Sequence, residues 1–147
     1  MKIIYKITTD KIDWSEVTKI FQLVGWGERP PNELKYAFSS SSYVRFAYDG
    51  EKLIGFGRTV DDGKYYAMIV DLIIMPEYQG KGIGSRILAD LKNQLKDFYF
   101  TTLTSSVGKE AFYKKQGWKI QKTAFIWPRT EKQESEHTIK KITFNSN

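Results

Sequence analysis

Residues 70–95 read VDLIIMPEYQGKGIGSRILADLKNQL, and the rest of the chain is organised around them. Residues 70–75 form a short apolar run rich in β-branched side chains, which predicts a buried strand. Pro76 cannot donate a hydrogen bond to a neighbouring strand, so the strand is expected to end before it. After three glycines at alternate positions, apolar residues recur at helical spacing with polar residues between them. The stretch therefore predicts a strand, a glycine-rich turn and an amphipathic helix.

A turn of this kind can hold a large anion. The first N–H groups of a helix lack partners within the helix and lie at the positive end of its dipole. Glycines remove the Cβ atoms that would keep an anion away from those groups. Two common phosphate-binding motifs do not match this turn. The Walker loop, Gly-x-x-x-x-Gly-Lys-Ser/Thr, does not occur in the chain, and the dinucleotide-binding motif Gly-x-Gly-x-x-Gly fails because Ser85 stands where its third glycine would be. A tight turn without a ligand is the alternative.

The turn does match the pattern Gln/Arg-x-x-Gly-x-Gly/Ala, at Gln79, Gly82 and Gly84. With the Val/Ile-x-Pro sequence just ahead of it, this pattern resembles the acetyl-CoA-binding motif of the GCN5-related N-acetyltransferase (GNAT) superfamily. A second segment, residues 110–118 (EAFYKKQGW), resembles the Phe-Tyr-x-x-x-Gly-Phe signature of the same superfamily, with Trp118 in place of the last phenylalanine.

Composition and charge exclude several classes of protein and of functional site. The 147 residues fit one domain, and the absence of cysteine excludes disulfides, a thiolate nucleophile and a zinc–cysteine cluster. No apolar run reaches the length of a membrane span and the first residues lack the apolar core of a signal peptide, so we expect a cytoplasmic protein without a membrane partner. The net charge of +6 favours anionic partners, but the lysines are spread along the whole chain, so nucleic acid is not an expected partner.

Helix and strand signals occur on both sides of the central stretch. Asp13 begins a capping box for a helix that ends near Gly25, and Asn32 is expected to cap a short second helix. Asp49-Gly50 and Asp62-Gly63 are typical of hairpin turns. Further strands are expected at residues 2–8, 43–48, 53–60, 98–104 and, as one or two strands, 118–127, with a connector at 39–42 and a short helix at 107–116.

This order of elements resembles that of a GNAT domain over about residues 5–127. The strand at 98–104 follows the central helix, which favours a parallel pairing with the strand before that helix. The resemblance implies an α/β (α+β) fold, with a mixed, mostly antiparallel sheet flanked by helices. We expect the GNAT domain at residues 1–128 and a polar C-terminal extension at 129–147, in which residues 138–144 are either an added strand or part of a frayed tail.

The resemblance also assigns an expected proton donor. In many GNAT enzymes the tyrosine of the second signature lies near the thioester sulfur and protonates the departing thiolate of CoA, and Tyr113 matches that position. A phenol with a pKa of about 10 is comparable to the thiol that it would protonate. The alternative is that Tyr113 only packs against the sheet and lines the cofactor. Many relatives carry an asparagine seven residues before this tyrosine, where this chain has Ser106, a shorter hydrogen-bonding group.

Acetyl-CoA is the cofactor that the resemblance implies. Its pantetheine arm would lie along main-chain groups at the splayed end of the central strand, where one amide would stabilise the oxyanion of the tetrahedral intermediate. The apolar side chains there are equally compatible with a place in the core. The residues expected to bind the cofactor are Leu72, Ile73, Ile74, Gln79, Gly80, Lys81, Gly82, Ile83, Gly84, Ser85, Ser106 and Phe112.

Acceptor specificity in this superfamily lies mainly in the first two helices, their loop and the late strands. The candidate acceptor residues in those helices and their loop are Trp26, Glu28, Arg29 and Tyr36. Their aromatic rings suit a small aryl or alkyl amine and Glu28 would attract a cation, although each residue is equally compatible with a surface or packing role. Asp71 is a candidate base or cation ligand, with a structural role as the alternative. Deprotonation through water is the other route, so the base stays unassigned.

We therefore expect an acetyl-CoA-dependent N-acetyltransferase of the EC 2.3.1 class. The acetyl group would pass to a primary amine by direct attack within a ternary complex, without a metal. A small-molecule amine is the expected acceptor and a protein amine the runner-up. A non-catalytic GNAT module that binds acyl-CoA is the competing reading, and a homodimer is compatible with the sequence.

Overall fold

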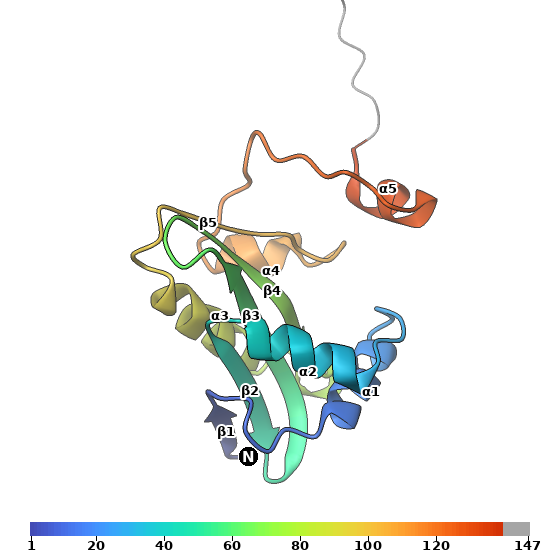
Figure 1. The fold of residues 1–147 in the computed structure, drawn as a ribbon, viewed down its shortest axis with the longest axis vertical. Helices are drawn as coiled ribbons and strands as arrows, with labels where there is room; N and C mark the ends of the chain where they lie inside the picture. Colours follow the sequence, from blue (N-terminus) through green and yellow to red (C-terminus); the bar gives the residue numbers. More distant parts are fainter. Residues whose placement is uncertain (140–147) are drawn as a thin grey trace, which may run out of the picture. The chain divides into compact units, whose positions relative to one another are not determined.

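A computed structural model describes residues 1–139 of the chain. It divides into two compact units, Met1–Thr104 and the described part of Ser105–Asn147, and each is treated by itself below (Figure 1). Among the described residues, no helix is long and apolar enough to cross a membrane.

The first unit is built on a five-stranded sheet with the order β1-β2-β3-β4-β5 (Figure 1). The strands are β1 (Ile3–Lys6), β2 (Val44–Asp49), β3 (Lys52–Asp61), β4 (Tyr66–Ile74) and β5 (Phe100–Leu103). The first four pair with their neighbours in antiparallel fashion, whereas β4 and β5 are parallel. The predicted mixed, mostly antiparallel sheet is confirmed, including the parallel pair on either side of the central helix.

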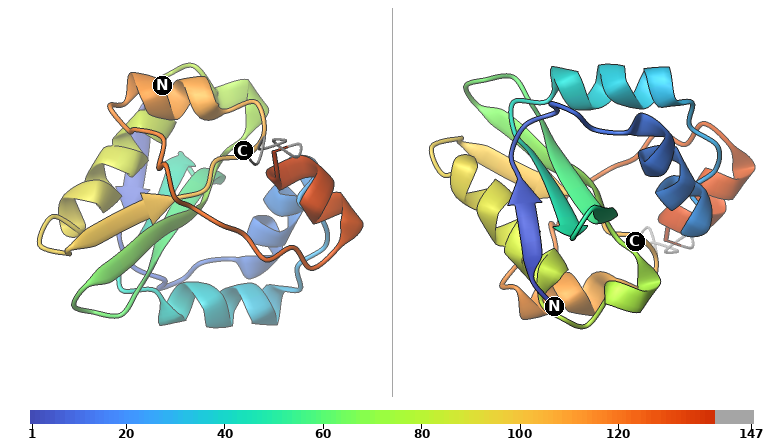
Figure 2. Two further views of the ribbon diagram at one scale, coloured as in Figure 1. Left: turned by 90° about the horizontal axis from the view of Figure 1, so that it is seen from above. Right: turned by 90° about the horizontal axis from the view of Figure 1, so that it is seen from below.

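Helices cover both faces of this sheet. They are α1 (Trp14–Leu23), α2 (Pro31–Ser40), the single-turn 3₁₀ helix η1 (Pro76–Tyr78) and α3 (Ile83–Gln94). Figure 2 shows α1 and α2 on one side of the sheet and α3 on the other. The buried side chains of α3 are Ile83, Ile87, Leu88 and Leu91, which confirms the apolar face predicted for the central helix.

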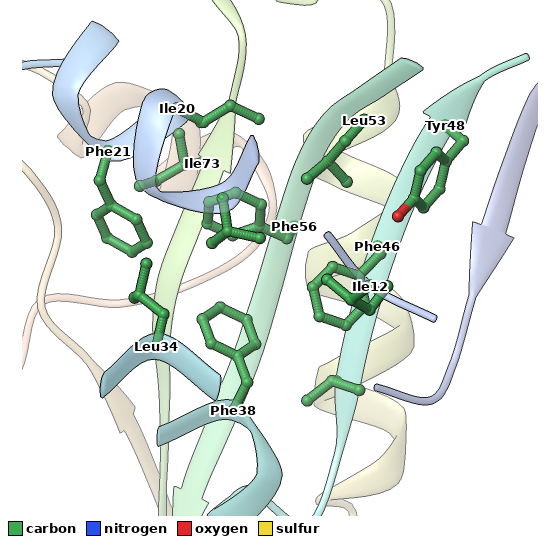
Figure 3. Close-up of a cluster of buried hydrophobic side chains, with 12 residues drawn as sticks. Ile12, Ile20, Phe21, Leu34, Phe38, Phe46, Tyr48, Leu53, Phe56 and Ile73 are labelled. Atoms are coloured by element: carbon green, nitrogen blue, oxygen red, sulfur yellow. The ribbon is translucent and has the colours of Figure 1, made fainter. Parts of the chain in front are cut away.

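Aromatic side chains form the centre of the core between the sheet and the α1–α2 pair (Figure 3). Phe21, Phe38, Phe46 and Phe56 are fully buried. The ring of Phe56 lies 5.4 Å from that of Phe21, 5.6 Å from Phe38 and 6.4 Å from Phe46, measured between centroids. Burial of each such side chain contributes about 1.5–3 kcal/mol, so these rings, together with Val17, Ile20 and Leu34 of the same cluster, hold the two helices to the sheet.

The start of the second helix differs from the prediction. Asp13 caps α1 as expected, its carboxylate accepting from the N–H of Ser15 at 3.0 Å. However, α2 begins at Pro31, so Asn32 lies inside the helix and is not its cap. Proline is favoured at the first helical position because its φ is already helical and its missing N–H is not needed there. The helix also runs on to Ser40, which makes the predicted connector at 39–42 shorter.

The second unit contains two short helices, α4 (Glu110–Lys115) and α5 (Glu131–His137). The one or two strands predicted at residues 118–127 are wrong, because this described segment forms turns and irregular backbone. Aromatic and β-branched residues favour a strand only where a neighbouring strand supplies hydrogen bonds and packing. Here Phe125, with 97% of its surface exposed, has no such packing.

Helix α5 is an element that the sequence analysis missed. The hydroxyl of Thr130 accepts from the N–H of Gln133 at 3.0 Å, and the side chain of Gln133 accepts from the N–H of Arg129 at 2.7 Å. Such reciprocal capping begins helices at Thr-x-x-Gln sequences. Of the proposed strand at 138–144, residues 140–144 lie outside the described residues, and the domain limits 1–128 and 129–147 stay predictions.

Candidate active site

Strand β4 loses one of its two neighbours halfway along its length. It pairs with β5 from Tyr66 to Ile69, and beyond Ile69 no pairing with β5 occurs in the described part of the first unit. Its other edge stays paired with β3 as far as Ile74. One edge of residues 70–74 is therefore not used within the sheet. This is the segment where the resemblance to GNAT enzymes places the pantetheine arm.

A β-bulge lies at the point where β4 and β5 separate. Phe56 of β3 faces Ile73, but Arg58 faces Val70, so two residues of β4 lie opposite the single residue Gly57. A bulge of this kind bends the strand and changes the direction of the groups that follow it. The main-chain groups of residues 72–74 are therefore aimed by the bulge as well as by the sheet.

The side chains at the end of β4 serve the core. Ile73 and Ile74 are buried and Leu72 is half-buried. The chain passes very close to β3 here, because a Cβ on Gly55 would lie only 2.8 Å from the carbonyl oxygen of Ile73. The side chains of Ile73 and Ile74 are therefore taken up by the core, and a role of this segment in binding a cofactor through its main chain stays a prediction.

The glycine-rich turn connects η1 to α3 and has a backbone that favours glycine. Gly80 and Gly82 have φ of +76° and +85°, in the left-handed region that side chains rarely adopt. Gly82 is the N-cap of α3, where no side chain caps the helix and no acidic residue lies in the first turn. The positive end of the helix dipole is therefore not neutralised by the helix itself, as an anion-binding turn requires.

Two further candidates hold the turn in place or add charge to it. The side-chain amide of Gln79 donates to the carbonyl oxygen of Ile74 at 2.9 Å, which ties the turn to the end of β4. The ammonium group of Lys81 lies 5.5 Å from the centroid of the Tyr78 ring and adds a positive charge. Ile83 is buried, so it offers only its N–H to an anion, and Gly84 and Ser85 complete the first turn of α3.

The candidate acceptor residues lie around the connection between α1 and α2. Trp26 packs on Phe21, with 5.8 Å between ring centroids, while Glu28 is exposed. Tyr36 projects from α2 with 77% of its surface exposed. The guanidinium carbon of Arg29 lies 4.4 Å from the centroid of the Phe21 ring, a cation–π contact. The loop thus presents aromatic and charged side chains on a base fixed to α1.

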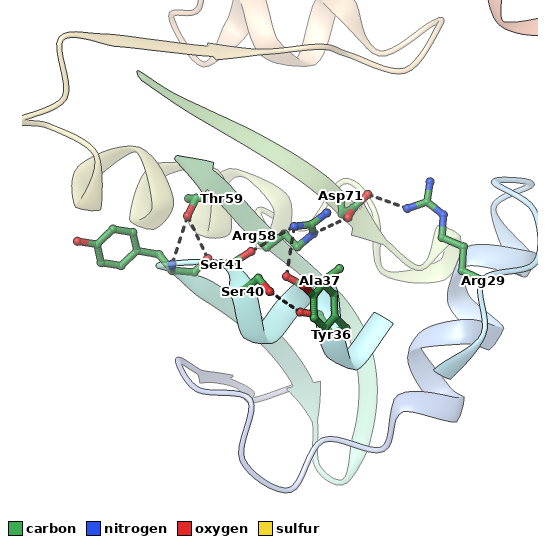
Figure 4. A network of polar contacts seen from close by, with 9 residues as sticks. Arg29, Tyr36, Ala37, Ser40, Ser41, Arg58, Thr59 and Asp71 are labelled. Carbon is green, nitrogen blue, oxygen red and sulfur yellow. Dashed lines mark hydrogen bonds and ion pairs between the residues drawn. The ribbon is translucent and has the colours of Figure 1, made fainter. Parts of the chain in front are cut away.

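Asp71 occupies the bulge, and its carboxylate is paired with two arginines (Figure 4). Its Oδ2 accepts from the Nε of Arg58 at 2.7 Å and its Oδ1 from the Nη1 of Arg29 at 3.3 Å. The sequence analysis missed Arg58, although a single arginine in the otherwise apolar stretch LIGFGRTV was the available signal. Both carboxylate oxygens are engaged, which favours the structural alternative for Asp71.

Tyr113, the expected proton donor, belongs to α4 in the second unit. Its ring meets that of Phe112 edge to face, with 5.0 Å between centroids. Partial burial raises the pKa of Tyr113 above the ordinary tyrosine value. The phenol therefore keeps its proton at neutral pH, as a proton donor must. The carbonyl of Ser106 accepts from the N–H of Lys109 at 3.0 Å, which fixes the turn that leads into α4.

Comparisons with known proteins agree with this geometry. A family model described as Acetyltransferase (GNAT) domain matches residues 26–126. The chain is 32% identical over 122 residues to Uncharacterized N-acetyltransferase ycf52 of Pyropia yezoensis, a match that covers 79% of this chain and 70% of that protein. It is 28% identical over 119 residues to Histone acetyltransferase TAP1 of Glycine max, covering 72% of this chain and 52% of that protein.

A solved structure shares the fold. The GNAT family acetyltransferase SP0256 from Streptococcus pneumoniae TIGR4 superposes with a TM-score of 0.74 at 29% sequence identity, covering 88% of this chain and all (100%) of that chain. Members of this family use acyl-CoA donors and act on amines. The family match, the relatives and the shared fold agree, and the chain belongs to the GNAT family of N-acetyltransferases.

Proposed function

We propose that this protein transfers the acetyl group of acetyl-CoA to the primary amine of a small molecule, by direct attack within a ternary complex. The observation that carries the proposal is the uncapped N-terminus of α3, preceded by the left-handed glycines Gly80 and Gly82. It follows directly on the part of β4 that has no β5 partner. An uncapped helix N-terminus, which would suit a diphosphate, thus follows a strand edge that β5 does not cover, which would suit the pantetheine arm of a CoA thioester.

The turn and the strand would divide the binding of acetyl-CoA between them. The N–H groups at the start of α3 would hold the diphosphate, with Lys81 adding a charge. Main-chain groups of residues 72–74 would hold the pantetheine arm. When bound, acetyl-CoA supplies an acetyl thioester that an amine can attack. Gln79 would keep the two parts of the site in register through its hydrogen bond to Ile74.

The chemistry then needs one oxyanion donor and one proton donor. An amide N–H of residues 72–74 would polarise the thioester carbonyl and stabilise the negative charge that develops on its oxygen. The amine nitrogen forms a bond to the carbonyl carbon and the carbon–sulfur bond breaks. Tyr113 would give its proton to the departing thiolate, since the partly buried phenol, whose pKa is raised, is protonated at neutral pH and has a proton to give. The attacking amine would lose its proton to water, because both oxygens of Asp71 are held by guanidinium groups.

A small amine is the acceptor that the α1–α2 loop supports best. Trp26 and the exposed ring of Tyr36 offer flat apolar surfaces, and the exposed carboxylate of Glu28 offers attraction to an ammonium group. A protein amine is the second candidate, since one relative is named a histone acetyltransferase. A cytoplasmic location is likewise a proposal from the sequence.

An assay of CoA release would test the proposal. The chain contains no cysteine, so a thiol reagent added to the reaction reports only the CoA that is set free. We expect release that requires both acetyl-CoA and a small primary amine from a panel of aryl and alkyl amines, with the acetylated amine identified by mass spectrometry. Release with lysine-containing peptides alone would move the acceptor to a protein. Acetyl-CoA binding without release for any amine would favour the non-catalytic module.

A further inference from the structure

Asp71 combines an unusual backbone with an unusual side-chain environment. Its φ of +55° lies in the left-handed region, which is uncommon for a residue other than glycine. Only 8% of its side chain is exposed, and two arginines from different parts of the first unit bind its two oxygens (Figure 4). Sparsely populated backbone conformations persist only where the surrounding structure supports them. The paired carboxylate is such a support for the bulge.

Each arginine connects Asp71 to a different element. Arg58 extends from β3, and its Nη1 also donates to the hydroxyl of Ser41 at 3.3 Å, at the end of α2. Arg29 belongs to residues 24–30, which we call the acceptor loop because it carries three of the candidate acceptor residues. The peptide carbonyl of Arg29 accepts from the hydroxyl of Thr18 at 2.7 Å, which fixes that point of the loop to α1.

A carboxylate this buried is stable only while it is paired. Removal of its charge leaves Arg58 without its nearest anion and releases Arg29 from the sheet. Breaking one partner of a buried ion pair is strongly unfavourable, whereas exposed pairs contribute little. The more buried pair with Arg58, at 2.7 Å, holds the carboxylate in place, and the pair with Arg29, at 3.3 Å, connects the acceptor loop to β4.

We propose that Asp71 is a positioning residue that couples the acceptor loop to the bulge that aims residues 72–74. The inference rests on the proposed function, because that function assigns the loop to the acceptor and the strand segment to the thioester. Asp71 acts through Arg29 and Arg58 and transfers no proton. A change at Asp71 therefore displaces the amine relative to the thioester carbonyl while the diphosphate site at α3 stays intact.

The first test uses Trp26 as a reporter inside the acceptor loop. The protein is labelled with 5-fluorotryptophan, and the resonance of Trp26 is assigned with a Trp26→Phe variant. Asp71→Asn keeps the size of the side chain, and asparagine tolerates positive φ. Arg29→Met removes the guanidinium group that pairs with Asp71. The Arg29 side chain is 40% exposed, so the protein should fold without this pair. The guanidinium carbon of Arg29 lies 5.8 Å from the centroid of the Trp26 ring, so Arg29→Met shifts the resonance by this contact alone. We expect Asp71→Asn to shift or broaden the Trp26 resonance as well, and to add little when Arg29→Met is already present.

Asp90 supplies a matched control. Its Oδ2 also faces two arginines, with Arg86 Nε at 3.2 Å and Arg45 Nε at 3.7 Å, but it lies on α3 and contacts neither the bulge nor the acceptor loop. Asp90→Asn should leave the Trp26 resonance unchanged. If Asp71→Asn also leaves it unchanged, the coupling is absent and the inference is wrong. This measurement needs neither acetyl-CoA nor an acceptor, so it stands apart from the test of the proposed function.

The second test separates positioning from proton transfer. For Asp71→Asn and for Arg29→Met we expect kcat/KM for the acceptor to fall about ten- to a hundredfold, since a small misplacement of a reacting group slows its reaction by that much. The dissociation constant of acetyl-CoA should change far less. A large fall in kcat for Asp71→Asn at unchanged KM, with Arg29→Met behaving like the wild type, would identify Asp71 as a base and overturn the inference.

Discussion

The two units of this protein differ in how they are stabilised. Among residues 1–139, every buried hydrophobic side chain belongs to the first unit, from Ile12 to Leu95. Neither α4 nor α5 in the second unit has a buried residue. Yet the second unit carries Tyr113, the candidate proton donor. We therefore expect loss of a buried side chain in the first unit to act mainly on folding, and loss of the Tyr113 hydroxyl to act mainly on the proposed reaction.

A pair of matched phenylalanine substitutions should show this difference most strongly. Phe56 is fully buried at the centre of the aromatic cluster, whereas Phe125 is 97% exposed. We expect Phe56→Ala to lower the free energy of unfolding by about 3–5 kcal/mol, through lost burial and a cavity. Phe125→Ala should change it by no more than about 0.5 kcal/mol. Urea denaturation followed by circular dichroism measures both, and equal losses would contradict the comparison.

Tyr113→Phe should show the opposite behaviour. Removal of the hydroxyl takes away the proposed proton donor, and general acid catalysis contributes about 10²–10⁴-fold to a rate. We expect kcat to fall by that range, while the unfolding midpoint and the affinity for acetyl-CoA stay close to those of the wild type. Unchanged kcat would assign Tyr113 to the lining of the cofactor site.

The ionisation of Tyr113 gives a smaller, spectroscopic signal. Burial raises its pKa, so the folded protein holds this proton at a pH where an ordinary tyrosine, with a pKa of about 10, is half ionised. The difference in tyrosinate absorbance between the wild type and Tyr113→Phe should therefore reach half of its final size at a pH above about 10. A midpoint at or below that pH would mean that the pKa is not raised.

The smallest effect is expected in the C-terminal helix. Thr130→Ala removes the side-chain cap of α5, and such a change costs about 1 kcal/mol of local helix stability. Amide hydrogen exchange should become faster over Glu131–His137, while exchange in the sheet of the first unit stays the same. Faster exchange in both places would indicate that the two units unfold together.

Local signals explain why the central part of the fold was predictable. The strand β4, the glycine-rich turn and α3 each have a distinct pattern of apolar residues or glycines, and Asp49-Gly50 and Asp62-Gly63 lie at the hairpin turns. These patterns depend on neighbours in the chain. The mixed sheet followed from their order, because a strand, a helix and a further strand form a parallel unit.

The features that the sequence does not predict depend on residues that are far apart in the chain. The pairing of Asp71 with Arg29 and Arg58 joins residues 42 and 13 positions apart, and no local pattern predicts it. The incorrect prediction of strands at residues 118–127 has the same cause, since β-branched and aromatic residues form a strand only beside a partner strand. Helix α5 does have a local signal in Thr130 and Gln133, but no buried apolar side chain accompanies it.

Calorimetry with acetyl-CoA measures whether the start of α3 binds the diphosphate. Gly82→Glu should abolish binding, because it adds bulk and negative charge there. Gly63→Glu is the matched control, because Gly63 has a similar φ of +78° and similarly open surroundings in the β3–β4 turn. We predict wild-type affinity in the micromolar range or tighter, kept by Gly63→Glu and lost by a folded Gly82→Glu. A folded wild type that does not bind acetyl-CoA, or a Gly82→Glu variant that binds it as well as Gly63→Glu, would show that the start of α3 is not the diphosphate site.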